Sequence, residues 1–391
     1  MATGKVHAVC PVHKQRGAAL LILLTIVLLA ASYALLKRLN KAPVEILLAA
    51  DNSHVLGEAK AALVGYALAA TDAPRQPGRL PCPDYGTVDN NFDGRSDACD
   101  EQAGFVTPGR LPWLTLGISE LHDRAGETLW FSPALELDGN NKINSETTTS
   151  LRLDGNGREV AAVIIAPGTV VNNQVRPTNP AAQDDPARYL EDANSVADVN
   201  YVTVSGNQAI DFNDQLVVIY RDELMQAVER RVLGELKSYL VKYYSDNGYY
   251  PYPAGLTGTA CDSTQLQGHV PEFVQSGDCT GLGLAEWGAA MPAWYIGQDW
   301  NQLTWYAPAP ACLQPTPNCS GSGLIEVVNT PAPNADKQAV LLAAGPSIGG
   351  EPRPATDITH LLDSGNDDGD FQFVKQPVDA SNNDQIVIVA P

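Results

Sequence analysis

A short acidic segment in the first quarter of the chain has the composition and spacing of a calcium-binding loop. Its oxygen-bearing side chains recur at the ligand positions of such loops, and glycine stands at the sixth position, where they turn sharply. Calcium would offset the repulsion between the carboxylates, although a solvated Asp/Asn turn is an equally open interpretation in an acidic chain. The candidate loop positions are Asp89, Asn91, Asp93, Arg95, Asp97 and Asp100.

Two other motifs suggest chemistry less specifically. Gly345 to Gly349 fits the G-x-S-x-G pattern of a serine nucleophile, but the Gly- and Pro-rich residues that follow cannot readily begin the helix which that motif needs. A second acidic cluster has irregular spacing, so it is a weak metal candidate; its members are Asp363, Asn366, Asp367, Asp368 and Asp370. No phosphate-binding glycine loop and no H-E-x-x-H zinc motif is present. His7, Cys10 and His13 in the N-terminal leader have a spacing that metal ligands could have, but incidental residues of an unfolded leader are the favoured interpretation. These observations favour a protein that is not an enzyme.

Six of the seven cysteines occur as pairs with short separations. The even count and the absence of a C-x-x-C motif favour three disulfides over a metal site or reduced thiols. Each bridge would staple a loop and constrain the unfolded chain. The predicted pairs are Cys82 with Cys99, Cys261 with Cys279, and Cys312 with Cys319.

Tryptophans recur in the second half of the chain, where they could form either a core or a contact surface. Trp130 and Trp305 occupy matching positions of an internal repeat, which favours core packing for both. Trp287 and Trp300 have no counterpart in the repeat, so they are the better candidates for a surface that contacts a partner.

Length and charge restrict the function classes. The chain has 391 residues, enough for two or three domains with sizeable cores. Hydrophobic residues make up 44%, which excludes global disorder. The formal net charge is −20, and so acidic a chain binds phosphate backbones poorly, which argues against a nucleic-acid partner.

The rest of the sequence is an internal duplication. Blocks of the first half return in the same order in the second half, which is the strongest signal in the sequence. A conserved order of several blocks is very improbable by chance. Matching blocks include Val55–Lys60 with Val232–Lys237, Leu129–Ala134 with Thr304–Ala309, Ala161–Ala166 with Ala339–Ala344, and Asn213–Ile219 with Asn383–Val389.

Each copy is expected to begin with a helix and to end in strands. In the second copy, apolar residues at i+3 and i+4 steps form one helical stripe from Asp222 to Tyr244. The short Val/Ile runs that close each copy are bounded by Gly, Asn, Asp and Pro, which is typical of strands in an antiparallel sheet. A helix packed on such a sheet gives an α+β domain. The members of the stripe are Leu224, Val228, Val232, Leu236, Leu240 and Tyr243.

The N-terminal segment has the pattern of a membrane helix. A basic stretch precedes Ala18 to Leu36, which contains no charged residue. As a helix this run would span about 28 Å, close to one bilayer core. It could be a plain anchor or, with Ser32-Tyr33-Ala34 as a weak cleavage site, a secretory signal.

A third interpretation of this segment comes from a resemblance. Lys14-Gln15-Arg16-Gly17 directly before the apolar run resembles the signal of type IV prepilins. The resemblance implies cleavage between Gly17 and Ala18 by a prepilin peptidase, and packing of the mature helix against other pilin or pseudopilin subunits. Ile22 stands where the family usually has glutamate, a departure seen in certain minor pilins and in the tip pseudopilin of type II secretion.

Together, these features predict an α+β fold: a long N-terminal transmembrane helix followed by two duplicated pilin-like heads, each a helix packed on an antiparallel sheet. The expected divisions are a basic leader at 1–17, a transmembrane segment at 18–36, a first head at 37–220 and a second head at 221–391. The expected location is a bacterial inner membrane, crossed once, with the C-terminal domains in the periplasm or in an extracellular filament.

The expected function is that of a non-enzymatic minor pilin or pseudopilin in a type IV filament or type II secretion pseudopilus, with the tip as the favoured position. The alternative is a membrane-anchored periplasmic binding or adhesion protein that does not assemble. Expected partners are other pilin subunits, the prepilin peptidase and the inner membrane, and the candidate cofactor is Ca²⁺.

Overall fold

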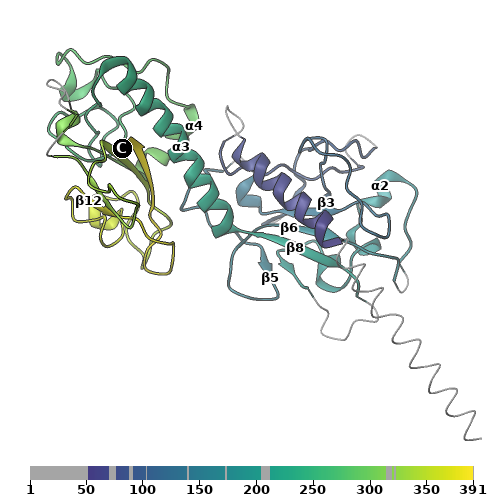
Figure 1. The fold of residues 1–391 in the computed structure, drawn as a ribbon. Helices are drawn as coiled ribbons and strands as arrows, with labels where there is room; N and C mark the ends of the chain where they lie inside the picture. Colours follow the sequence, from purple (N-terminus) through teal and green to yellow (C-terminus); the bar gives the residue numbers. More distant parts are fainter. Residues whose placement is uncertain are drawn as a thin grey trace, which may run out of the picture. The chain divides into compact units, whose positions relative to one another are not determined.

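The computed structural model describes residues 52–390, apart from 70–75, 88–90, 103, 139–140, 172–173, 204–211, 314–318 and 321–322. His54–Pro391 form one compact unit (Figure 1). It contains the two copies of the internal duplication: the first copy extends to Tyr220, and the second copy begins at Arg221. The predicted boundary between the two heads falls between a strand and a helix that are consecutive in the chain.

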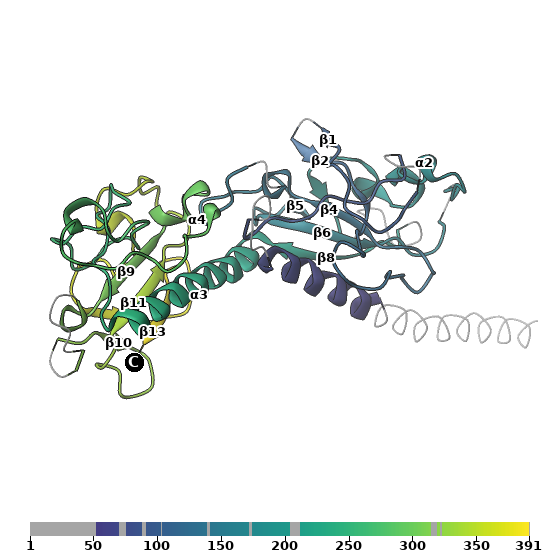
Figure 2. The ribbon, with the colours of Figure 1, turned by 90° about the horizontal axis from the view of Figure 1, so that it is seen from above.

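The first copy is built on a four-stranded antiparallel sheet in the order β3-β4-β6-β8. Every residue of β6 is buried, because this Val/Ile/Ala strand lies between two others and is covered on both faces. A helix at 52–68 lies along the sheet next to β6 and β8, and Lys60 Nζ donates to the Val218 carbonyl at 3.0 Å (Figures 1 and 2). The strands are β3 Gly109–Arg110, β4 Trp130–Pro133, β6 Val160–Ala166 and β8 Gln215–Tyr220.

The second copy repeats this sheet. Its strands are β9 Thr304–Pro308, β11 Ala339–Ala343 and β13 Gln385–Ala390, all antiparallel, in the order β13-β11-β9. An isolated bridge between Gly268 and Tyr306 extends the sheet where β3 extends the first one. Each strand of the second sheet comes from the sequence block that matches its counterpart, so the duplication is structural as well as sequential.

Helix α3, Arg221–Asn247, follows directly after β8. The predicted apolar stripe is confirmed: all six of its residues are buried. Gly248 ends the helix in the left-handed conformation (φ 78°) that glycine adopts without strain, and its N–H donates to the Tyr244 carbonyl. The helix contacts β11 and β13 of its own copy and also β6 and β8 of the first copy.

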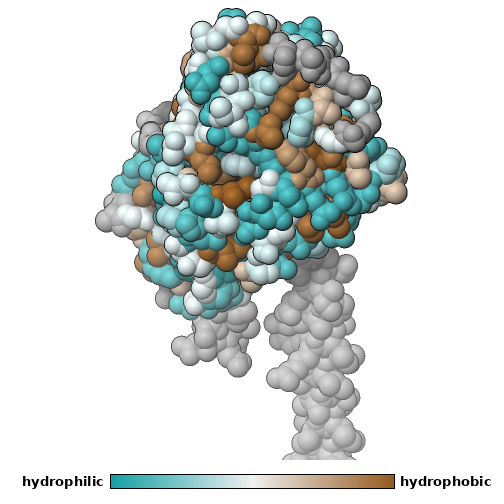
Figure 3. Space-filling model, turned by 90° about the vertical axis from the view of Figure 1, so that its left-hand side faces the viewer, coloured by the Kyte–Doolittle hydropathy of each residue, from teal (hydrophilic) through white to brown (hydrophobic). Residues whose placement is uncertain are grey.

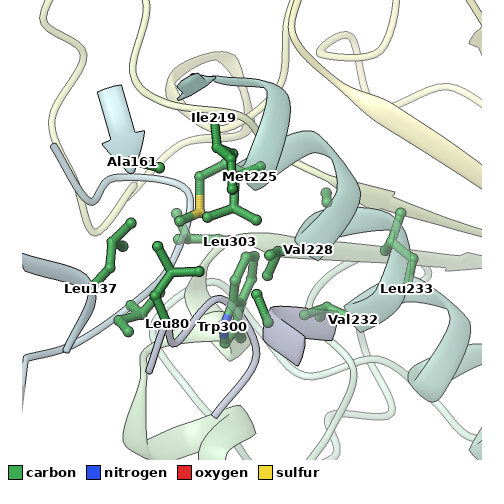
Figure 4. Packing of buried hydrophobic residues seen from close by; sticks show 14 of the residues in the cluster. Leu80, Leu137, Ala161, Ile219, Met225, Val228, Val232, Leu233, Trp300 and Leu303 are labelled. Carbon is green, nitrogen blue, oxygen red and sulfur yellow. The ribbon is translucent and has the colours of Figure 1, made fainter. Parts of the chain in front are cut away.

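The two copies share one hydrophobic core. Buried residues of both copies belong to a single contiguous cluster. Figure 4 shows Leu80 and Leu137 of the first copy near Met225 and Val228 of α3, with Trp300 of the second copy among them. Helix α3 therefore supplies apolar side chains to a core that both copies share. A second, small cluster belongs to the second copy alone; its members are Tyr243, Cys261, Val274, Cys279 and Leu284.

The remaining elements are short. Two small parallel sheets repeat between the copies, β5 Arg152–Leu153 with β7 Asn200–Tyr201, and β10 Glu326–Val328 with β12 Gln372–Val374. An antiparallel pair joins β1 Glu101–Gln102 to β2 Phe105–Val106, and two short helices are α2 Pro180–Gln183 and α4 Ala293–Gly297. Single 3-10 turns occur at η1 Leu135–Leu137, η2 Pro186–Arg188, η3 Asp192–Ser195, η4 Gly277–Cys279, η5 Trp300–Gln302, η6 Pro310–Cys312 and η7 Ile358–His360.

The structure corrects two predictions that concern a membrane. The predicted transmembrane segment at 18–36 lies outside the described residues. Among the helices that are described, none combines the length and the apolar character needed to cross a bilayer; α3, the longest, carries charged side chains along its length. The α+β class with helices on antiparallel sheets stands, but the fold with a long transmembrane helix and the single-pass inner-membrane location are not supported.

Candidate functional site

The predicted cleavage residues, Gly17 and Ala18, lie outside the described residues. The three predicted disulfides are confirmed. Cys82–Cys99 closes the loop that follows the first helix, Cys261–Cys279 closes the related loop after α3, and Cys312–Cys319 closes a local turn.

The predicted calcium loop is clamped by the Cys82–Cys99 bridge, but two of its carboxylates already have protein partners. Asp93 accepts the N–H of Arg95 at 2.8 Å and pairs with its guanidinium at 3.2 Å. Asp97 accepts the N–H of Tyr85 at 2.7 Å. Asn91, Arg95 and Asp100 are exposed, and Asp89 lies outside the described residues.

Gly94 turns this loop for a reason that involves no metal. Its φ is 79°, and a Cβ added there would lie 2.3 Å from the Trp113 ring, so only glycine fits the turn. In the part of the chain that is described, no group of three or more His, Cys, Asp or Glu side chains is placed to hold a metal ion. The calcium site stays a prediction.

The two candidate contact tryptophans have different environments. Trp300 is fully buried, so the prediction that it forms a contact surface is wrong: it belongs to the shared core. Trp287 is half-buried and packs edge-on against Tyr243, with ring centroids 5.2 Å apart. It lines a small groove beside the C-terminal half of α3. On the face shown in Figure 3, hydrophobic residues are interspersed with hydrophilic ones.

The G-x-S-x-G motif does not form a nucleophile elbow. Ser347 Oγ donates to the Glu351 carbonyl at 2.9 Å. Gly349 and Gly350 both have positive φ, so the chain turns there where an elbow would continue into a helix.

Sequence reasoning missed a buried carboxylate-amide network that occurs once in each copy. In the first, Asp214 Oδ2 accepts from the backbone N–H of Glu191 and from Asn194 Nδ2, each at 3.0 Å. In the opposite direction, Glu191 Oε2 accepts hydrogen bonds from the backbone N–H groups of Asn213 and Asp214. This network, the carboxylate clasp, ties the start of β8 to the turn η3.

The second copy repeats the clasp with Asp384, Asp363 and Asn366. Asp384 Oδ2 accepts from the Asp363 N–H and from Asn366 Nδ2, and Asp363 Oδ2 accepts the Asp384 N–H. Asp363 and Asn366, two members of the irregular acidic cluster, therefore have a structural role in this hydrogen-bond network. The repeated Asn-Asp-Gln block was the available signal, because it places a buried carboxylate at the start of a strand in both copies.

The clasps make stability depend on pH. Burial, together with the negative charge of Glu191, raises the pKa of Asp214 to about 8. Burial, with a smaller contribution from Asp363, raises the pKa of Asp384 to about 7. These values exceed those of an unfolded chain, so the folded state binds more protons between about pH 4 and pH 8. The free energy of unfolding should therefore fall as pH rises through this range.

We expect Asp214→Asn with Asp384→Asn to flatten that pH dependence, because amides keep the acceptor oxygens without titrating. One pKa unit corresponds to about 1.4 kcal/mol, and the two pKa values lie roughly 4 and 3 units above that of an unfolded Asp, so the free energy of unfolding of the wild type should fall by several kcal/mol, with about 10 kcal/mol as the upper limit. Urea denaturation at several pH values measures it. Asp222→Asn, whose carboxylate is 51% exposed, is the matched control. An equally steep fall in the double variant would contradict the assignment.

The strongest candidate binding site is a polar pocket in the first copy, which we call the Arg110 pocket. Its cavity measures 240 Å³. Its floor is the guanidinium of Arg110, which lies 4.4 Å from the ring centroid of Trp130 and 4.2 Å from that of Tyr189. The lining residues are Asp84, Phe92, Arg110, Leu111, Trp113, Glu120, Gly126, Glu127, Thr128, Gln183 and Tyr189.

The strand β3 holds Arg110 rigidly. Its backbone exchanges two 3.0 Å hydrogen bonds with Asp84 on one side and pairs with Trp130 on the other. Gly109 precedes it because a Cβ there would come within 2.7 Å of Pro83 and Tyr85. Burial lowers the pKa of Arg110 to about 10, against the opposing effects of Tyr189 and Glu127, so the side chain stays cationic at neutral pH.

The second copy has the same strand pairing at the equivalent position, but a different residue type stands there. His269 holds the position of Arg110, since it bridges Ala254 as Arg110 bridges Asp84. It is buried edge-on against Trp305, and its ring nitrogens face the carbonyls of Thr304 and Leu256. At this position of the repeat, the first copy therefore has a guanidinium that lines a cavity, and the second copy has a buried imidazole.

Sequence reasoning did not find the Arg110 pocket because its residues come from four separate segments. The available signal in the sequence was the matched pair Trp130 and Trp305. The residue beside the first is Arg110, whereas the residue beside the second is His269. Comparisons with protein families, with curated proteins and with solved structures found no match for this chain.

Proposed function

We propose that the chain is a non-enzymatic, pilin-like subunit of a type IV filament or type II secretion pseudopilus. The observation that carries the proposal is the repeated unit of a helix on an antiparallel sheet, the architecture expected of a pilin head. The helix at 52–68 occupies that place in the first copy, and α3 occupies it in the second. The leader-like residues up to Gly17 and the apolar run after them support the same function from the sequence.

Assembly in this proposal is a matter of packing and needs no catalytic group. The first helix is held on its sheet by the apolar face formed by Leu56, Ala59 and Leu63 and by the bond from Lys60 to the Val218 carbonyl. Lys60 also forms an ion pair with Glu223 of α3 at 2.8 Å. The disulfides hold the loops at the ends of the sheets. Such a head could pack as one unit against neighbouring subunits of a filament.

Processing of the N-terminus tests the proposal. We expect intact-mass analysis of the protein from its own host to show a start at Ala18, and to show an uncut chain in a host without the prepilin peptidase. Gly17→Val should block the cut, whereas Gly4→Ala, the matched control in the leader, should leave it unchanged. A Met1 start in the normal host, or a cut near Leu35, would contradict the proposal.

The alternative function is that of a binding or adhesion protein that does not assemble. The Arg110 pocket favours it, because a buried cation in a cavity is a feature of ligand recognition and not of filament packing. An uncut N-terminus together with ligand binding would support this alternative.

A further inference from the structure

The Arg110 guanidinium is a buried cation without a carboxylate partner among the described residues. Arg110 is 6% exposed, and its side chain donates from Nη1 to the Thr128 carbonyl at 3.3 Å and also hydrogen-bonds to the Tyr189 side chain. A guanidinium carries five N–H donors, and a buried charge is stabilised most by a direct ion pair. The charge of Glu127 stabilises the Arg110 cation, but no described carboxylate forms an ion pair with it. An anionic ligand in the cavity would supply the missing partner.

The acids around the cavity are engaged elsewhere. Glu127 pairs with Arg176 at 3.3 Å. Glu120 lies 3.3 Å from His122 and accepts from Thr128 Oγ1 at 3.2 Å. Asp84 accepts the Gly94 N–H at 2.7 Å. These bonds point the three carboxylates toward protein groups and leave the Arg110 fork facing the cavity.

We propose that the Arg110 pocket binds a small ligand that joins one carboxylate to a hydroxylated ring, the chemistry of a uronic acid. The planar fork of arginine matches a carboxylate in a bidentate manner. The cavity of 240 Å³ has room for about one such ring. This inference does not depend on whether the chain assembles into a filament.

The charges around the site limit the ligand to a single negative charge. Asp84, Glu120 and Glu127 line the same cavity and would repel a phosphate or sulfate dianion more than a monoanion. The chain as a whole carries −20, which opposes the approach of polyanions.

The other lining groups suit a hydroxylated ring. Phe92 and Trp113 line the cavity and supply aromatic surface against which the C–H face of a sugar can pack. Gln183 Oε1 and the carboxylate oxygens can accept hydrogen bonds from hydroxyls around that ring. A purely aromatic acid would fill the space but would leave these polar groups without partners, which costs binding energy.

Saturation-transfer NMR on the full chain tests the proposal with three probes. Glucuronate carries both the carboxylate and the hydroxylated ring, glucose lacks the carboxylate, and benzoate lacks the hydroxyls. We expect glucuronate to bind with a Kd at least tenfold lower than either of the others. Equal affinities, or no binding of glucuronate, would overturn the proposal.

Arg110→Lys assigns the binding to this pocket. It keeps the positive charge but removes the fork, so we expect at least a tenfold loss of glucuronate affinity with an unchanged circular dichroism spectrum. Arg158→Lys is the matched control, because Arg158 also stacks on a tyrosine, Tyr220, but outside the cavity. Full affinity in a folded Arg110→Lys variant would overturn the assignment.

If Arg110→Lys does not fold, an NMR measurement on the wild-type protein tests the same assignment. With nitrogen-labelled arginine, one guanidinium resonance should shift when glucuronate is added and should not shift with glucose. Identical arginine spectra with and without glucuronate would overturn the proposal.

Discussion

Replacing Gly268 with alanine should strongly destabilise the second copy, by about 3 kcal/mol or more. A Cβ at this position would lie 2.0 Å from the Ala254 carbonyl oxygen. That oxygen cannot move away freely, because it accepts the His269 N–H at 2.9 Å, while Gly268 itself exchanges two hydrogen bonds with Tyr306. The clash would therefore break the bridge between Gly268 and Tyr306, which extends the sheet beyond β9.

Urea denaturation measures this effect, and Gly258→Ala is its matched control. Gly258 lies in the same loop region, its φ is not in the left-handed range, and the nearest atom to an added Cβ is 4.0 Å away. We expect the control to change the free energy of unfolding by less than about 1 kcal/mol. Equal midpoints for the two variants would contradict the close approach of Gly268 to Ala254.

Replacing Trp300 with alanine should cost about 3–5 kcal/mol, as is typical when a large aromatic side chain is removed from a core. Trp300 is fully buried in the cluster that both copies share, near Leu80 and Val228 (Figure 4). The loss should destabilise the first copy as well, because the cavity would open at the junction of the copies.

Trp287→Ala is the control for this prediction, because Trp287 is only half-buried, at a groove on the margin of that core. We expect a smaller loss from it, about 1–2 kcal/mol, since the side chain already contacts solvent. Denaturation followed by circular dichroism compares the two variants. If Trp287→Ala proved the more destabilising change, the assignment of Trp300 to the shared core would be wrong.

Several features of the fold could be predicted because they are local or repeated. The stripe from Leu224 to Tyr243 follows the 3.6-residue helical period, so it identified α3. The disulfide pairs followed from even counts and short separations. The matching Val/Ile blocks identified equivalent strands such as β6 and β11.

The candidate site could not be predicted in the same way. Arg110 and Tyr189 are far apart in the sequence, and no local pattern records that their side chains stack. The irregular cluster at Asp363 suggested a metal, whereas in the structure its carboxylate accepts backbone N–H groups. In both cases the partner of the charged group comes from a separate segment of the chain.

The sequence by itself determined the duplication, the second helix, the main strands and the three disulfides, because each depends on residue type at short or repeated spacings. Only the tertiary structure decided that Trp300 is buried, that α3 joins both copies in one core, and that Arg110 faces a cavity. The reason is physical: periodicity encodes the face of an element, but the distance between elements depends on how their side chains pack together.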